Sequence, residues 1–254
     1  MENATSRHAR FQAVKLIFAI GGFIASLGLS SCGVQVDASI SAGRKASMQL
    51  QVAVDPVLQA YLVDLAGTGS DGKPVEIFNA DRIRARLAEE PGITIRSLEA
   101  NLRGGIKLSL DVSDLQKLFT GKNSTVKNVF SLTSNGGLSS LRIVLDRSAV
   151  ESFLGLGLEK NDTSLRYLLP QNASLSADKY RENLRWALEE YGTKDQLAQM
   201  FKSAVLAIHL TLPAPVQSAS GFTISDKAAG KVALNLSLLE LMTIQGSRVY
   251  EVRY

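Results

Sequence analysis

An uncharged apolar run followed by a lone cysteine constrains this sequence more than any other feature. No charged side chain occurs from Leu16 to Leu29, and Arg7, Arg10 and Lys15 precede the run. At about 1.5 Å per helical residue the run reaches roughly 21 Å, which is short of the ~30 Å hydrocarbon core of a bilayer. A basic start and a short apolar centre are typical of a cleavable secretory signal. We therefore expect the folded protein to begin after residue 31.

The residues that follow the apolar run resemble the bacterial lipobox. Leu29-Ser30-Ser31-Cys32-Gly33 places one aliphatic and two small residues before a cysteine. The resemblance implies that the Cys32 thiol receives a diacylglyceryl group and that signal peptidase II cleaves between Ser31 and Cys32. It also implies sorting to the outer membrane in a host with two membranes, because Gly33 rather than Asp follows the cysteine. A plain secretory signal with a chance cysteine is the alternative.

Cys32 is the only cysteine in the chain, so it has no internal disulfide partner. Acyl chains contribute about 0.8 kcal/mol for each buried CH2, and two or three of them would hold the protein permanently on a membrane. No later segment has the roughly 18 consecutive apolar residues of a spanning helix. We expect the lipid on Cys32 to be the link to the membrane.

The charge balance argues against a nucleic-acid partner. The whole chain holds 28 Lys and Arg against 24 Asp and Glu. Residues 1–31 account for three of the basic and one of the acidic residues, which leaves a formal net charge of +2 for the rest. Binding to a phosphate backbone depends on a basic patch that this balance does not supply.

Alternating apolar residues predict three β-hairpins in the first half of the folded chain. Helix signals lie between them, because Asp55-Pro56, Asn79 and Ser113-Asp114 each offer an N-cap ahead of apolar residues at helical spacing. The predicted strand pairs are 34–40 with 48–54, 93–100 with 106–112, and 126–133 with 141–145. The fold class is therefore α+β, with antiparallel hairpins that alternate with amphipathic helices.

The second half of the chain begins with a helical pattern, clearest from Ser176 to Tyr191. We expect a helical insertion near residues 148–203. Strand patterns then return at 206–212, 232–236 and 249–254. We expect residues 1–31 to be a signal peptide and residues 32–254 to form one ectodomain that includes the helical lobe.

The sequence provides no recognisable catalytic or cofactor motif. His209 would have to serve any Ser-His-Asp triad, because His8 lies in the predicted signal. Strand alternation puts His209 on the more polar face, so we expect a solvated or sheet-edge side chain. Residues 67–73 resemble a phosphate-binding loop, but Pro74 stands where a hydroxyl should hold magnesium, which favours a surface loop. We expect no cofactor, no metal and no catalytic residue, with a weak calcium site left open, and we expect Trp186 in the core.

Two stretches of the chain resemble the LppM-type lipoproteins. In residues 34–55 a strand follows the lipobox cysteine and a second strand runs into a helix. In residues 212–252 a Leu-Pro-x-Pro turn precedes a glycine-containing strand and a closing strand. The resemblance implies a β-rich ectodomain that binds lipid. It carries over no binding residue.

These observations predict a non-enzymatic, membrane-anchored lipoprotein that binds a lipid, a glycolipid or another cell-envelope ligand at the membrane surface. Strand alternation starts at Val34, and two residues span at most about 7 Å, so the ectodomain should lie against the membrane. The alternatives are a structural or assembly lipoprotein that engages envelope proteins, and an envelope hydrolase. The hydrolase is disfavoured because Ser-x-x-Lys matches at Ser70, Ser124 and Ser176 lack their companion elements.

Overall fold

The computed structural model describes residues 32–67, 78–101, 105–121, 124, 126–156, 170 and 174–254. The folded unit extends from Ser31 to Tyr254. Its strands are β1 (Gly33–Ile40), β2 (Ala46–Ala53), β3 (Ile93–Asn101), β4 (Gly105–Val112), β5 (Phe130–Asn135), β6 (Leu138–Leu145), β7 (Val205–Thr211), β8 (Ser218–Ser220), β9 (Thr223–Asp226), β10 (Lys231–Ser237) and β11 (Arg248–Arg253). Its helices are α2 (Pro56–Ala66), α3 (Ala80–Ala88), α4 (Leu115–Thr120), α5 (Arg147–Leu156), α6 (Ala177–Leu188), α7 (Lys194–Ser203) and α8 (Leu238–Met242).

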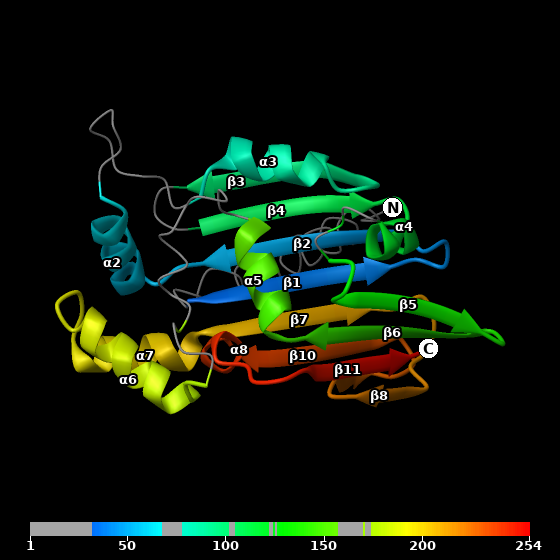
Figure 1. Ribbon diagram of the computed structural model, residues 1–254. Coiled ribbons are helices and arrows are strands. Elements are labelled where there is room, and N and C mark those ends of the chain that lie inside the picture. Colours follow the sequence, from blue (N-terminus) through cyan, green and yellow to red (C-terminus); the bar gives the residue numbers. More distant parts are fainter. Residues whose placement is uncertain are drawn as a thin grey trace, which may run out of the picture. The chain divides into compact units, whose positions relative to one another are not determined.

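Seven strands form the large sheet, in the order β3-β4-β2-β1-β7-β10-β9 (Figure 1). Neighbouring strands of this sheet are antiparallel except at the centre, where β1 pairs in parallel with β7. This pairing runs from Gly33 opposite Val205 to Ser39 opposite Thr211. Parallel strands need a crossover connection, and here the crossover contains the whole middle of the chain. The start of the folded chain therefore lies beside β7.

The two faces of the large sheet differ in polarity because side chains alternate along each strand. On β1, for example, Gln35, Asp37 and Ser39 share the outer face, and Val36 and Ile40 share the inner face. The inner face packs in the main core. The outer face is polar.

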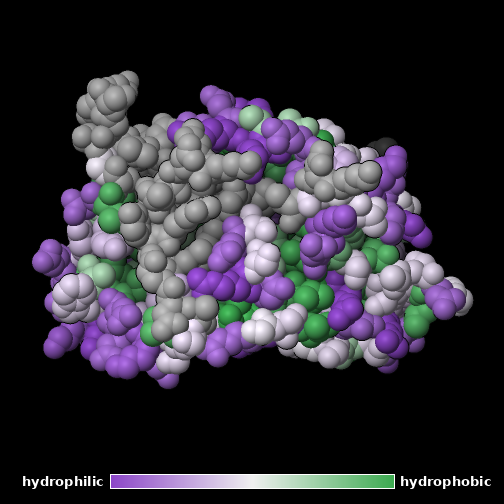
Figure 2. Space-filling model, in the orientation of Figure 1, coloured by the Kyte–Doolittle hydropathy of each residue, from purple (hydrophilic) through white to green (hydrophobic). Residues whose placement is uncertain are grey.

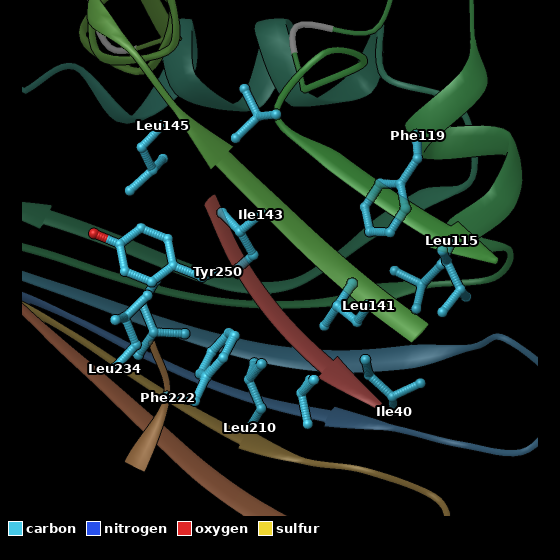
Figure 3. Close-up of a cluster of buried hydrophobic side chains, with 14 of the residues drawn as sticks. Ile40, Leu115, Phe119, Leu141, Ile143, Leu145, Leu210, Phe222, Leu234 and Tyr250 are labelled. Carbon is cyan, nitrogen blue, oxygen red and sulfur yellow. The ribbon is translucent and has the colours of Figure 1, made fainter. Parts of the chain in front are cut away.

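The small sheet covers part of this inner face and has the strand order β5-β6-β11-β8. Tyr250 on β11 pairs with Ile143 on β6, and both side chains are buried. Figure 3 shows side chains from the small sheet meeting Ile40, Leu210 and Leu234 of the large sheet in one core. Each fully buried side chain of this size stabilises the fold by about 1.5–3 kcal/mol. The two sheets are held together mainly by this apolar contact.

Three helices begin at the N-cap residues that the sequence predicts. The predicted caps Asp55, Asn79 and Asp114 each accept a hydrogen bond from a backbone amide of the helix that follows, which is α2, α3 or α4. The three predicted hairpins and the α+β class are also confirmed. One boundary is wrong, because residues 126–129 form a turn and β5 begins only at Phe130.

The stretch 148–203 is helical in α5, α6 and α7, but these helices join two different clusters. Ala149 and Val150 of α5 belong to the main core. Leu188 of α6 and Leu197 of α7 belong to a second, smaller cluster with α2. The predicted helical lobe is therefore divided between the core of the sheets and a separate group of helices.

The packing at the start of β10 can be tested at Gly230, with Gly246 before β11 as the control. Gly230 has a φ of +68°, and a Cβ there would lie 2.6 Å from the Ala214 carbonyl oxygen and 2.7 Å from that of Leu212. Gly246 has a φ of +75° with nothing within 4 Å. Alanine at either position costs roughly 1–2 kcal/mol of backbone strain, and at Gly230 the clash should add about 1–3 kcal/mol. Gly230→Ala should therefore lower the free energy of unfolding in urea more than Gly246→Ala, and equal losses would contradict this packing.

Candidate functional site

Cys32 lies where the folded chain begins, directly before β1. Its side chain is buried in a small apolar group that we call the Cys32 cluster. Desolvation raises the pKa of the Cys32 thiol, which keeps the thiol protonated and unreactive. Ser31, the other residue of the predicted cleavage site, lies outside the described residues. The other buried members of the cluster come from α2, α6 and α7: Val57, Leu188, Leu197 and Met200.

The register of the large sheet brings these helices to Cys32. Gly33 pairs with Val205 on β7, and α7 ends just before β7, so Cys32 lies beside the end of α7. Gly33 also pairs with Ala53 on β2, and Val57 in the first turn of α2 follows soon after. Residues distant in sequence thus meet at one end of the large sheet (Figure 1). A sequence pattern reports only local spacing, so it did not indicate this cluster.

An open hollow of about 600 Å³ lies next to the Cys32 cluster, between α2 and the turn after α6. Tyr191 in this turn donates a 2.5 Å hydrogen bond to Asp64 and meets the ring of Tyr61 edge-on, with centroids 5.6 Å apart. The hydrogen bond to Asp64 is the main cause that raises the pKa of Tyr191 to about 12. Val63 adds an apolar wall and Glu190 a second carboxylate. The lining of the hollow therefore combines two carboxylates, one from α2 and one from the turn, with apolar groups.

A broader apolar surface lies on the inner face of the large sheet. Its side chains on β4, such as Leu108 and Leu110, are buried. Several of those on β1, β2 and β3 are only partly buried: Val36, Met48, Leu50, Val52, Ile93, Ile95 and Leu98. On the face of the molecule that Figure 2 shows, hydrophobic residues lie in small groups between hydrophilic ones. Partly exposed aliphatic groups of this kind can contact an aliphatic ligand.

The outer face of the large sheet carries His209. Its Nδ1 lies 2.9 Å from an Asp37 carboxylate oxygen on β1, and the Gln35 amide donates to the other oxygen at 2.8 Å. The His209 side chain is 47% exposed. The prediction of a solvated histidine is confirmed, although β7 lies inside the sheet rather than at its edge. The pair links two central strands at the surface.

The prediction that Trp186 packs in the core is wrong. Trp186 is 75% exposed on α6. Leu184 and Leu188 form the stripe of α6 that contacts the Cys32 cluster. Trp186 lies midway between them in sequence, which at 3.6 residues per turn puts it on the opposite side of the helix. The prediction relied on the apolar character of Trp186, whereas the helical spacing indicates the exposed side of α6.

The remaining candidates from the sequence have structural roles or fall outside the described residues. Ser176 caps α6, and the Ser124 hydroxyl accepts a hydrogen bond from a backbone amide within its turn. Residues 68–77, which include Ser70 and all of the phosphate-loop pattern after Gly67, lie outside the described residues. In the described chain, no group of three or more His, Cys, Asp or Glu residues is placed to share a metal ion. None of the described helices has the length and apolarity to cross a membrane.

No protein-family model matches this chain, and no curated protein matches it in sequence. Among solved structures, it is similar to the NMR structure of the folded domain of LppM from Mycobacterium tuberculosis. The identity is 14%, the alignment covers 87% of this chain and 89% of that chain, and the TM-score is 0.39. LppM also gives its name to the family that the two stretches of sequence resemble. What this chain does must be inferred from its own residues.

The hydrogen bond between Tyr191 and Asp64 predicts an unusual titration. The Tyr191 phenol should ionise near pH 12, because ionisation gives up the hydrogen bond and places a phenolate beside a carboxylate. The stability linked to this raised pKa is present below about pH 10 and is lost as the pH rises through the folded-state value. Phenolate absorbance should show this step in the wild type and lose it in Tyr191→Phe. Asp64→Asn should lower its midpoint, and an unchanged midpoint would contradict the assigned cause.

Proposed function

We propose that this chain is a non-enzymatic lipoprotein, held on a membrane outside the cytoplasm by acyl chains on Cys32. In a host with two membranes, we propose the outer membrane. The position of Cys32 supports the proposal most directly, because the folded unit begins at Ser31 and β1 begins at Gly33. The lipobox-like segment thus coincides with the boundary of the folded unit, where cleavage would remove residues 1–31 and leave the fold intact.

The buried position of Cys32 belongs to the chain without a lipid. A diacylglyceryl group is far larger than the space that a cysteine side chain occupies among Val57, Leu188 and Met200. The acylated Cys32 would therefore turn out of the cluster, which it can do once residues 1–31 no longer precede it. The acyl chains would then leave the domain beside α2 and α7, with no linker between the anchor and β1.

We propose that the domain binds a lipid, a glycolipid or another cell-envelope ligand at the membrane surface. The partly buried aliphatic side chains on β1, β2 and β3 support an apolar ligand, because transfer of aliphatic surface from water is favourable. The short distance to the anchor supports a ligand taken from the same membrane. An acyl chain that moves from the leaflet to this surface would avoid a long passage through water.

An assembly role is the second candidate, supported by the edges of the sheets. Within the described part of the chain, β3 and β9 each pair on one side only. Ile224 on β9 is also 41% exposed. A strand edge of this kind can accept a strand from a partner protein in the envelope. This candidate needs no bound lipid.

The anchor is tested by Cys32→Ala in bacteria that are fed a palmitate analogue. The wild-type protein should carry the label, and Cys32→Ala should lose it and retain residues 1–31, because no thiol remains for acylation. Ser31→Ala keeps a small residue before the cysteine and should be labelled like the wild type. Labelling of Cys32→Ala at the wild-type level would overturn the proposal.

The ligand is tested by native mass spectrometry of the processed protein released gently from membranes. The wild type should carry a further mass, in the range of a lipid, in addition to the mass of the acylated chain. Leu50→Gln puts an amide on the inner face and should reduce the loaded fraction several-fold, since a buried polar group without a partner costs about 1–3 kcal/mol. Gln51→Ala changes the outer face of the same strand and should load normally. Absence of any added mass would favour the assembly role, with thermal unfolding to verify that each variant is folded.

A further inference from the structure

Trp186 is the most exposed large hydrophobic side chain in the described residues. It is 75% exposed, whereas the next, Val249, is 43% exposed. A tryptophan ring has a large apolar area and one polar N–H group, so it is stabilised best where one side is apolar and the other is wet. One exposed ring is not a site in itself. The position of Trp186 relative to Cys32 is the second observation.

Trp186 lies on α6, one of the helices that pack around Cys32. Two residues later on α6, Leu188 is packed in the Cys32 cluster. Two further exposed apolar side chains share this end of the domain: Leu65 on α2 is 40% exposed, and Val205, opposite Gly33, is 38% exposed. In Figure 1, α2, α6 and α7 lie at the end of the large sheet where β1 starts, and the β5–β6 hairpin points to the other end.

The charges along α6 and α7 are balanced, and α2 adds one more carboxylate, Asp64. Lys179 pairs with Glu182 and Arg181 pairs with Asp178 along α6, at 2.9 Å each. From residue 176 to residue 204 the basic residues are equalled in number by the acidic ones: Lys179, Arg181, Arg185, Lys194 and Lys202 against Asp178, Glu182, Glu189, Glu190 and Asp195. An excess of positive charge, which draws a surface to anionic lipids, is therefore missing from this stretch. Attraction to a bilayer here would be apolar.

We infer that the end formed by α2, α6 and α7 rests on the lipid bilayer and that Trp186 inserts into the interfacial layer. The inference rests on the proposed anchor at Cys32. An anchor without a linker holds these helices within reach of the bilayer, so a weak contact is sufficient. Tryptophan is enriched at the level of the lipid head groups, where its ring and its N–H group are both satisfied. The domain therefore has one membrane-facing end rather than free rotation about its anchor.

The test uses the single tryptophan of the chain as a fluorescent probe. The full-length protein is processed in cells, purified with its lipid and reconstituted in phosphatidylcholine vesicles that contain a brominated lipid. Trp186 should lie about 5–10 Å into the boundary layer, so lipids brominated near the head group should quench its emission strongly. The quenching should persist in high salt because the contact is apolar. The matched control is Trp186→Phe with Leu138→Trp, which moves the probe to the β5–β6 hairpin.

Three outcomes separate the inference from the proposed function. Strong quenching of Trp186 with little quenching of the control supports the membrane-facing end. If the protein floats with the vesicles but both probes are quenched equally, or neither is, the orientation is wrong and the anchor stands. If the wild type does not float with the vesicles, the anchor itself is wrong and the inference falls with it. Flotation of the control variant verifies that the exchange of residues leaves the anchor intact.

Discussion

The parallel pairing of β1 with β7 is the interaction on which the rest of the structure depends. It joins β1, the first strand of the folded chain, to β7, the strand that follows α7, and it satisfies backbone groups of β1 that β2 cannot reach. Without it, β3-β4-β2-β1 and β7-β10-β9 would be two separate sheets, each with an incompletely covered apolar face. The same pairing holds Cys32 beside α7, so the core and the candidate anchor site have one common cause.

The sequence predicted what depends on neighbours along the chain. Alternation gave the hairpins, and the caps at Asp55, Asn79 and Asp114 gave the helix starts, because these signals act over a few residues. The parallel pairing of β1 with β7 could not be predicted in this way, because the residue pattern of β1 does not indicate which strand it pairs with. β8 and β9 were missed because three or four residues are too few to show alternation. Cys32 was singled out by its motif alone, and its burial among distant helices was not foreseeable.

The two faces of the large sheet divide the molecule into surfaces with different chemistry. The outer face has polar side chains and the pair of Asp37 with His209, whose side chains are about half exposed. The inner face is apolar and packs against the small sheet and against side chains of α3, α4 and α5. If the helical end of the domain lay on a membrane, both faces of the large sheet would stand roughly perpendicular to the bilayer. Its polar side would then contact water.

The burial of Cys32 has a consequence for the order of events during maturation. In the folded domain the thiol is enclosed and its pKa is raised, so an acylating enzyme would find neither access nor a ready thiolate. If Cys32 is acylated as proposed, the modification must precede the docking of α2, α6 and α7 around it. α6 and α7 lie far along the chain from Cys32, so in an exported chain they would emerge only after most of the residues that precede them. If the chain is exported as proposed, the topology leaves an interval in which the cysteine is accessible, and folding then encloses it.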